Sequence, residues 1–381
     1  MEDFVFHNPT KIIFGRGKET QIGPELKAAG HGKVLLVYGR KSYKESGLHD
    51  RVAASLAEAG ISYVEFGGVV PNPLLTHTRE GILLAKKEEV DAVLAVGGGS
   101  VLDEAKAIAV GALTEIDIWD FFTGLEIPGA LPVFTILTLA ATGSEMNGNS
   151  VITNETTKEK FNIGSPHTYP KVSIMNPELT ASVSKEYTAY SAVDAIAHVL
   201  EGYFTGAPHT KLQDRLVESV ITTIMETTEV ILEKPHDYQA RAEFEWAATL
   251  ALNGITTAGI GEFGFPNHMI EHSLSAIYDI AHGAGLAIVI PAWMKWYKPQ
   301  NPKKFERFAW EIFGVEGADA GIAALEEWFT RIKAPVRLEE VNIPAAEIEQ
   351  IAVNVMRLAN KWQQQANYPQ ETVEAILRLA A

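Results

Sequence analysis

The sequence predicts an α/β domain with a parallel, doubly wound sheet, followed by an all-α domain. Two observations lead to this fold class. Short apolar runs alternate with amphipathic segments up to about residue 180, a pattern typical of a parallel sheet with helices on both faces. Beyond that point only helical periodicity remains. A chain of 381 residues exceeds one ordinary hydrophobic core, so we predict two domains, 1–180 and 181–381.

The strands of the first domain are predicted from continuous apolar runs that end in glycine. Residues 33–39 (Lys-Val-Leu-Leu-Val-Tyr-Gly) and residues 91–97 (Asp-Ala-Val-Leu-Ala-Val-Gly) have the length and apolar character of buried parallel strands. Amphipathic stretches at 48–59 and 76–88 predict helices between the strands. This alternation is the basis for the parallel arrangement.

The second domain shows apolar residues at helical spacing almost throughout. Capping residues such as Ser184, Asn301 and Pro344 mark the starts of several helices. Residues 263–266 interrupt the pattern and predict a loop that leads into the next helix. The predicted helices cover residues 186–205, 211–233, 238–256, 267–278, 283–298, 302–313, 317–332, 345–365 and 370–380.

Composition narrows the class of protein. Lysine and arginine number 32 against 48 acidic residues, and this net charge of −16 disfavours nucleic acid and anionic membrane surfaces as partners. The absence of cysteine excludes disulfides and thiolate zinc sites. The sequence shows neither a basic, apolar leader at its N-terminus nor a run of roughly 20 apolar residues, so we expect a cytoplasmic protein.

Four metal-capable side chains lie at helical spacing in the second domain. Asp194 and His198 are four residues apart, so a helix would project both from one face. His268 and His272 repeat this spacing, and His282 follows just before a glycine. Any one such pair is often only a polar position on an amphipathic helix. Together they indicate a metal site, because a carboxylate with several imidazoles suits Fe(II), Zn(II), Co(II) or Mn(II) better than Ca or Mg.

A glycine-rich turn in the first domain indicates a nucleotide site. Residues 96–106 (Val-Gly-Gly-Gly-Ser-Val-Leu-Asp-Glu-Ala-Lys) run from a strand into a helix, where backbone amides and the helix N-terminus can approach a pyrophosphate. Leu102 occupies the last glycine position of the standard dinucleotide fingerprint, so the match is incomplete. A plain strand-to-helix turn is the alternative.

A second turn of small residues follows the apolar run 132–137. It reads Thr138-Leu-Ala-Ala-Thr142-Gly-Ser144-Glu-Met-Asn147, and its hydroxyl groups can bond a phosphate or the nicotinamide edge. A hydroxyl-rich turn that caps its own backbone is the alternative, and by itself this turn favours that alternative. The two turns together support a coenzyme site.

These motifs, in this order, resemble one known family. The order is residues 71–73 (Pro-Asn-Pro), residues 97–103, residues 142–145 (Thr-Gly-Ser-Glu), the Asp194 and His198 pair, and then His268, His272 and His282-Gly. Over nearly the whole chain this resembles the iron-dependent (group III) alcohol dehydrogenases, and most of all their butanol dehydrogenase and aldehyde reductase branch. The resemblance implies an N-terminal dinucleotide-binding α/β domain and a helical, metal-binding and catalytic C-terminal domain, the architecture shared with dehydroquinate synthase. It also implies a homodimer.

The resemblance assigns roles position by position. It implies that Asp194, His198, His268 and His282 bind the metal, and that His272 lies beside it without binding. The aldehyde reductase branch usually has a tryptophan near residue 263, where this chain has Phe263-Gly-Phe-Pro. The shape of the substrate pocket is therefore the property that the resemblance predicts least well. Some coenzyme-binding residues follow from the resemblance, and others from the two turns and from the coenzyme choice described below. The predicted coenzyme-binding residues are Gly39, Arg40, Lys41, Ser42, Asn72, Gly97, Gly98, Gly99, Ser100, Asp103, Thr138, Thr142, Ser144, Asn147, Lys160 and Leu179.

Coenzyme choice depends on the end of the first long strand. NAD enzymes usually have a carboxylate there that accepts from the ribose 2′-hydroxyl and repels a 2′-phosphate, whereas this chain has Gly39. Arg40, Lys41 and Ser42 follow and can bond a phosphate. We therefore predict NADP(H) over NAD(H). If these charges are merely solvated, the enzyme would accept both coenzymes.

The predicted reaction is reversible hydride transfer between nicotinamide C4 and the carbon of a primary alcohol or aldehyde, such as butanol or butanal. The metal, Fe(II) or else Zn(II), would act as Lewis acid. His272 is the candidate proton relay, because imidazole titrates near neutrality and a helix places it one turn from His268. A relay through the coenzyme ribose and water is equally compatible.

Other functions match parts of the sequence. Residues 268–272 match the H-x-x-E-H pattern of inverted-zincin peptidases, but the nucleotide turns and the Asp194 and His198 pair have no place in one. An NAD-dependent polyol dehydrogenase of the glycerol type shares the architecture and is the nearest alternative. A synthase of the dehydroquinate type needs a dense basic set, and residues 255–300 offer only Lys295 and Lys298. A metal-binding scaffold would leave the nucleotide turns without a purpose.

Overall fold

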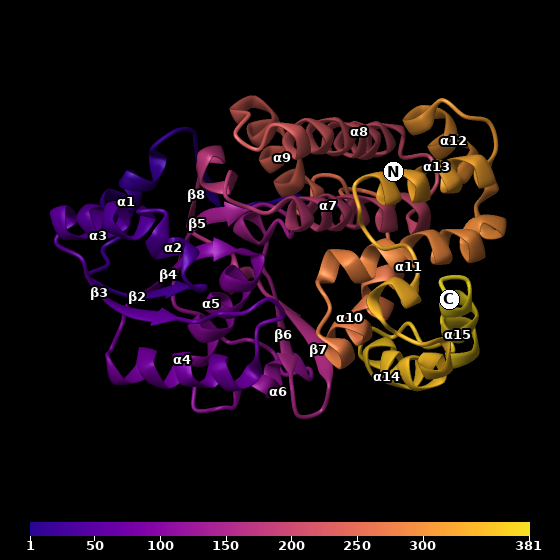
Figure 1. Ribbon diagram of the computed structural model, residues 1–381. Coiled ribbons are helices and arrows are strands. Elements are labelled where there is room, and N and C mark those ends of the chain that lie inside the picture. The colour runs from indigo at the N-terminus through magenta and orange to yellow at the C-terminus, as the bar shows by residue number, and fades with distance from the viewer. The chain divides into compact units, whose positions relative to one another are not determined.

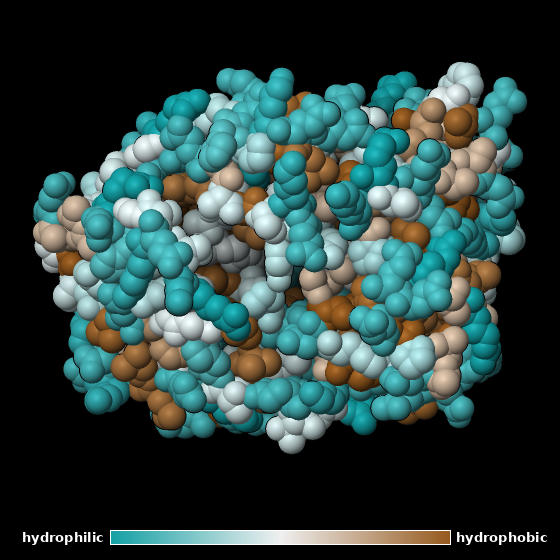
Figure 2. Space-filling model, in the orientation of Figure 1, coloured by the Kyte–Doolittle hydropathy of each residue, from teal (hydrophilic) through white to brown (hydrophobic).

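The computed structural model describes residues 1–381, which form two compact units (Figure 1). The sheet unit comprises residues 7–155 and 160–182, and the helical unit comprises residues 1–6, 156–159 and 183–381. The chain contains no helix with the length and apolar character needed to cross a membrane. On the face shown in Figure 2, hydrophilic residues prevail and hydrophobic residues occur in small groups.

All strand pairs of the six-stranded sheet are parallel, which confirms the predicted fold class. The strand order is β1-β8-β5-β4-β2-β3. From β2 the chain goes to the edge strand β3 and then returns to the opposite side of β2 for β4, so the winding direction switches between β2 and β4. The strands are β1 (Lys11–Phe14), β2 (Lys33–Tyr38), β3 (Ser62–Gly67), β4 (Ala92–Gly98), β5 (Val133–Leu139) and β8 (Val172–Met175).

Helices cover both faces of this sheet (Figure 1). Alternate residues such as Leu36, Leu94 and Ile136 pack against α1 and α3 on one face, as expected for strands buried on both sides. On the other face α4 and α5 pack so closely that a Cβ on Gly81 of α4 would lie only 2.4 Å from Ile108 of α5. The helices are α1 (Ile22–Ala28), α2 (Ser42–Glu45), α3 (Leu48–Ala59), α4 (Leu75–Lys87), α5 (Gly99–Gly111) and α6 (Ile118–Phe122); β6 (Asn149–Asn154) and β7 (Glu159–Gly164) form a separate pair.

The helical unit contains nine α-helices and no strand, as the periodicity predicts. The Ser184 side chain accepts the Tyr187 backbone N–H at 3.1 Å and caps the first helix. The helices are α7 (Lys185–Thr205), α8 (Lys211–Glu233), α9 (Tyr238–Ala251), α10 (Pro266–Tyr278), α11 (His282–Tyr297), α12 (Pro302–Phe313), α13 (Ala318–Arg331), α14 (Ile348–Lys361) and α15 (Gln370–Arg378).

The prediction of a helix over 238–256 is wrong at its end, because α9 stops at Ala251. The Asn253 side chain accepts the Ile255 backbone N–H at 3.0 Å, and Gly254 has a φ of +94°. An Asx turn followed by a left-handed glycine is incompatible with continued helix. The pattern of apolar residues gave no sign of this turn.

Candidate functional site

The predicted metal ligands lie on three helices of the helical unit that contact one another. Asp194 and His198 are on α7, His268 is on α10, and His282 is the first residue of α11. The helix α7 contacts both α10 and α11, and α10 contacts α11. Residues that are far apart in the sequence are therefore brought together by helix packing.

Gly283 explains how α11 comes so near α7. A Cβ at this position would lie 2.1 Å from the carbonyl oxygen of Tyr190, a distance that no side chain can occupy. Only glycine allows the start of α11 to approach the α7 backbone so closely. The position of His282 beside Asp194 therefore depends on the glycine that follows it.

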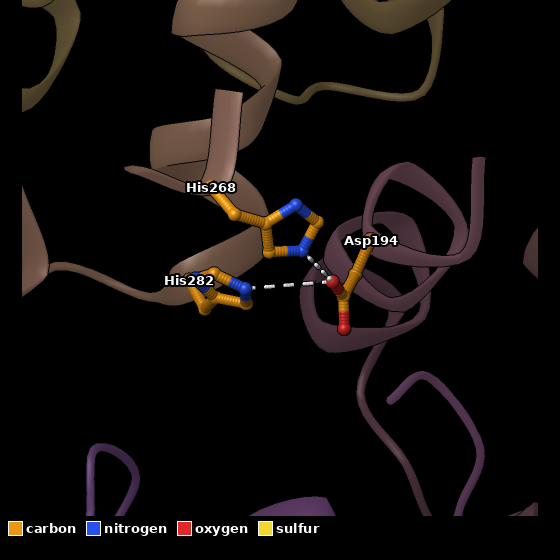
Figure 3. A group of neighbouring side chains, drawn as sticks. All are labelled: Asp194, His268 and His282. Atoms are coloured by element: carbon orange, nitrogen blue, oxygen red, sulfur yellow. Dashed lines mark ion pairs between the residues drawn. The ribbon is translucent and has the colours of Figure 1, made fainter. Parts of the chain in front are cut away.

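The imidazoles converge on a single carboxylate oxygen. Oδ1 of Asp194 lies 3.4 Å from Nε2 of His198, 3.6 Å from Nε2 of His268 and 3.5 Å from Nε2 of His282. Figure 3 shows His268 and His282 directing their ring nitrogens toward the Asp194 carboxylate. Ligand atoms of Asp194, His268 and His282 all lie within 4.8 Å of one another, as a shared cation requires.

The chemistry of this cluster fits a divalent transition metal. Oδ1 of Asp194 and Nε2 of His268 are buried and have no hydrogen-bond partner in the protein, although unpaired buried polar atoms are costly. Four ligands at about 2.1 Å from one ion in a tetrahedron are about 3.4 Å apart, close to the separations seen here. One carboxylate with three imidazoles suits iron or zinc. The residues present therefore fit the ion that the resemblance implies.

Burial and mutual charge perturb these groups strongly. Burial lowers the pKa of His198 to about 3. Burial would also lower the pKa of His268, but the carboxylates of Glu201 and Asp194 raise it to about 10. Burial alone would raise the pKa of Asp194, but the three histidines hold it well below its usual range. The Asp194 carboxylate is therefore ionised at neutral pH, as a metal ligand must be.

Two buried glutamates contact the ligand histidines, and our sequence reasoning missed their role. Glu201 lies 2.6 Å from Nδ1 of His268, and Glu271 bonds Nδ1 of His282. One signal was available for Glu201, because Asp194, His198 and Glu201 follow at spacings of four and three on one helical face. For Glu271 the only sequence hint was its place in the H-x-x-E-H pattern, which suggests a different role. Glu271 also accepts the Ser275 hydroxyl, so nothing here supports the peptidase alternative.

His272 is buried on α10 beside this cluster. Its ring centroid lies 5.6 Å from that of His282 and 6.3 Å from that of His268. The Trp362 ring, at the end of α14, lies 6.0 Å from His272, and Phe265 lies 5.7 Å from His268. Aromatic side chains therefore border His268 and His272.

The predicted coenzyme residues lie in the sheet unit, most of them at one edge of the sheet. Residues 39–42 follow β2, Asn72 follows β3, residues 97–103 span the end of β4 and the start of α5, and residues 138–147 span the end of β5 and the loop beyond it. Leu179 follows β8, and Lys160 on β7 donates to the Asn72 side chain at 2.9 Å. Carboxyl ends of parallel strands meet at one edge, and residues 39–42 and 97–100 flank the switch point where α/β folds bind ligands.

The two small-residue turns contact each other. A Cβ on Gly99 would lie 2.4 Å from Cγ2 and Oγ1 of Thr142, and a Cβ on Gly98 would lie 3.0 Å from Leu139. Gly97 is similarly closed in by Val101. Gly98 and Gly99 are therefore needed for packing between the turns, and Gly97 for packing within its own turn, reasons that the sequence alone did not reveal.

Two buried charged residues, Asp103 and Lys106, both bond the Ser144 hydroxyl and fasten the second turn. Asp103 accepts the Ser144 hydroxyl at 2.6 Å and the Val151 backbone N–H at 3.0 Å. Nζ of Lys106, which sequence reasoning also missed, donates to Ser144 and to the carbonyl oxygens of Asn147 and Asn149. Burial lowers the pKa of Lys106 to about 8. Direct coenzyme contact by Asp103 stays a prediction, since both its oxygens already accept protein donors.

The positively charged residues after β2 differ in whether they form ion pairs within the chain. Lys44 pairs with Glu65 at 2.6 Å, and Glu65 also accepts the Tyr38 hydroxyl at 2.6 Å. These bonds lower the pKa of Glu65 to about 2, and the bond from Lys44 has the largest effect. Arg40 and Lys41 are exposed and form no ion pair within the chain. Two uncompensated positive charges therefore stand at this strand end.

Fold and site together define an enzyme of a known class. Residues 9–177 match the family described as iron-containing alcohol dehydrogenase, and residues 188–381 match the C-terminal family of Fe-containing alcohol dehydrogenases. The chain belongs to the iron-containing alcohol dehydrogenase family and is an alcohol/aldehyde oxidoreductase of that type, which confirms the resemblance seen in the sequence.

Individual relatives specify the branch. The chain is similar to the crystal structure of NADH-dependent butanol dehydrogenase A from Thermotoga maritima, with a TM-score of 0.97, 51% identity, and coverage of 100% of this chain and 99% of that chain. It is 43% identical to a probable NADH-dependent butanol dehydrogenase 1 of Bacillus subtilis over 93% of this chain and 94% of the relative. It is 35% identical to the NADPH-dependent aldehyde reductase YqhD of Escherichia coli, covering 91% of each chain. These relatives support the butanol dehydrogenase and aldehyde reductase branch.

Proposed function

We propose that this protein is a metal-dependent oxidoreductase that transfers hydride between NADP(H) and a primary alcohol or aldehyde of the butanol/butanal kind. The observation that carries the proposal is the approach of three imidazole Nε2 atoms to Oδ1 of Asp194, at 3.4 to 3.6 Å. Relatives named butanol dehydrogenase and aldehyde reductase support the substrate class.

Asp194, His198, His268 and His282 would hold the ion, Fe(II) or alternatively Zn(II). When bound, the ion supplies a Lewis acid that polarises a carbonyl. The protein's own contribution is to present four donors from helices and to keep Asp194, His198 and His268 buried, so that electrostatic interactions are weakly screened. His282 is partly exposed. The cysteine-free sequence agrees with this purely oxygen and nitrogen donor set.

The residues at the carboxyl edge of the sheet would bind the coenzyme. Gly97 and Gly98 lead into α5, which begins at Gly99, and its N-terminal amides can donate hydrogen bonds to a pyrophosphate. Arg40 and Lys41 would bond the 2′-phosphate, since neither has a partner in the chain. This supports NADP(H), although relatives of both the NADH-dependent and the NADPH-dependent kind exist.

His272 would move the proton that accompanies hydride transfer. Its buried position one turn from His268 and its ring 5.6 Å from His282 support this role. Imidazole can both accept and donate a proton near neutral pH. A relay through the coenzyme ribose and water remains the alternative.

A homodimer and a cytoplasmic location are further parts of the proposal. The N-terminal segment supports self-association, because Val5 is 95% exposed and lies between Phe4 and Phe6, which are about half exposed. Neighbouring exposed apolar side chains of this kind mark contact surfaces. Light scattering after gel filtration should give a dimer for the native protein and a monomer for Val5→Asp, with Leu83→Asp as the exposed control that stays dimeric. A monomeric native protein would contradict the dimer.

The experiment that tests the function measures oxidation of NADPH, and separately of NADH, with butanal as acceptor. The protein is purified anaerobically, loaded with Fe(II) or Zn(II), and compared with a chelated control. We expect metal-dependent turnover that prefers NADPH. Preference for glycerol or 1,3-propanediol with NAD⁺ would favour the polyol alternative, and no turnover of any short aldehyde would refute the aldehyde reductase assignment.

A further inference from the structure

Glu201 holds His268 through three hydrogen bonds. Its carboxylate is fully buried on α7 and accepts Nδ1–H of His268 at 2.6 Å. It also accepts the backbone N–H of His268 at 3.1 Å and that of Asn267, both in the first turn of α10. One side chain on α7 therefore fixes both the start of α10 and the orientation of the imidazole that α10 carries.

Glu271 holds His282 in the same way. Its fully buried carboxylate bonds Nδ1 of His282 and accepts the Ser275 hydroxyl. Space for the carboxylate comes from Gly285 on α11, where a Cβ would lie 2.7 Å from Cγ and Oε1 of Glu271. The packing of α10 against α11 is thus shaped around this glutamate.

We propose that Glu201 and Glu271 are positioning residues of the metal site. Each bonds Nδ1 of its histidine, which leaves Nε2 directed toward Asp194 as the atom that would bind the ion. Each also makes its imidazole a stronger donor through the nearby negative charge. This inference rests on the proposed metal site and adds the groups that make it rigid.

His198 provides the internal contrast. Its Nδ1 is buried without a protein partner, so no carboxylate holds that side of the ring. It instead stacks on His268 with ring centroids 4.8 Å apart. The positioning role is therefore specific to the two imidazoles that reach Asp194 from α10 and α11.

The test replaces each glutamate by glutamine, which keeps the shape and removes the charge. Glu104 offers a matched control, because it is also fully buried and bonds Nδ1 of a histidine, His77, at 2.6 Å, but it lies in the sheet unit on α5. Affinities for Zn(II) and Co(II) are measured by competition with a coloured chelator. We expect E201Q and E271Q to bind about 10- to 100-fold more weakly than the native protein. E104Q should bind as the native protein does.

The outcomes separate the two proposals. A native protein that binds neither metal would refute the proposed metal site itself. Native binding together with native-like binding by E201Q and E271Q would leave the metal site standing and overturn the positioning role. Equal weakening in E104Q would also overturn it, because the effect would then be a general loss of stability.

A second measurement uses only the native protein, so it tests the inference even if the glutamine variants fail to fold. Native protein with ¹⁵N-labelled histidine is loaded with Zn(II) and studied by NMR. We expect two metal-bound imidazoles whose Nδ1 protons appear at the low-field position of carboxylate-bonded N–H groups. Metal-bound imidazoles without such protons would contradict the inference.

Discussion

Nζ of Lys106 donates to both the carbonyl oxygen and the hydroxyl oxygen of Ser144, each at 2.7 Å. The same ammonium group lies three residues from Asp103, which accepts the Ser144 hydroxyl from the other side. A buried lysine and a buried aspartate on α5 thereby fasten the turn that follows β5. The shape of the proposed coenzyme site depends on this pair.

Lys106→Met should therefore destabilise the protein strongly. Removing one of two interacting buried charges typically costs about 3 to 5 kcal/mol. Here the acceptors on Ser144, Asn147 and Asn149 would lose their donor, and the buried charge of Asp103 would lose a nearby opposite charge. Urea unfolding measures this loss. Lys11→Met is the control, since the exposed Lys11 and Glu25 pair should contribute less than about 1 kcal/mol. Equal effects of the two substitutions would contradict the role of Lys106.

Gly99→Ala should weaken coenzyme binding. The new Cβ would lie 2.4 Å from the Thr142 side chain and push the two turns apart. We expect the KM for the coenzyme to rise about 10-fold or more, equivalent to about 1.4 kcal/mol, while metal affinity stays unchanged. Gly32→Ala is the control, because its Cβ would meet Asp91 at an ordinary 3.7 Å. An unchanged KM for Gly99→Ala would show that the turns can separate without harm.

The double variant Arg40→Ala, Lys41→Ala tests coenzyme choice. Charge-assisted bonds to a phosphate contribute about 1.5 to 3 kcal/mol, so the ratio of kcat/KM for NADPH over NADH should fall about 10- to 100-fold. Lys44→Ala should change this ratio little, because Lys44 is already paired with Glu65. If the native protein prefers NADH, as several relatives do by name, the NADP(H) proposal fails while the enzyme class stands.

His272→Ala should slow turnover by about 10²- to 10⁴-fold, the usual contribution of a general acid or base. Metal content should be unchanged, because Asp194, His198, His268 and His282 remain. The exposed His236 serves as the control position. Loss of metal from His272→Ala would make His272 a ligand, and native turnover would favour the route through ribose and water.

The pair of His77 and Glu104 predicts a pH dependence of stability. The hydrogen bond to Glu104 raises the pKa of His77 above its ordinary value of 6.5. A group whose folded pKa is raised stabilises the fold fully below its unfolded pKa and loses that effect as pH rises through the folded pKa. The free energy of unfolding of the native protein should therefore approach that of His77→Gln as pH rises above 6.5. A constant difference from pH 6 to 9 would exclude this linkage.

Much of the fold and part of the site could be predicted from local periodicity. The spacing of Asp194 and His198 on α7, and the apolar runs of β2 and β4, are properties of single elements and are visible in the sequence. The sequence patterns alone did not identify all four metal ligands, and the family resemblance was needed to assign them. The reason is that the histidines converge on one oxygen only when three helices pack together. The sequence gives no direct measure of that packing.

What could not be predicted involves contacts between elements. Glu201 orients a histidine on another helix, and Gly283 matters because of the Tyr190 carbonyl on α7. Glu271 was visible in the sequence only as part of the local H-x-x-E-H pattern, whereas its partner His282 lies outside that pattern. Lys106 seemed to be one more residue of a strand-to-helix motif until its acceptors beyond β5 were known.

Asp194 lies next to three histidines, and we propose that these four side chains hold one catalytic metal ion. The most direct measurement is the metal bound per chain, by mass spectrometry after anaerobic loading with Fe(II) or Zn(II) and dialysis. We expect about one ion per chain for the native protein, and almost none for Asp194→Ala, since a metal ion bound on folding depends on its full ligand set. An Asp194→Ala protein that keeps the native amount of metal, or a native protein that binds none, would contradict the proposal.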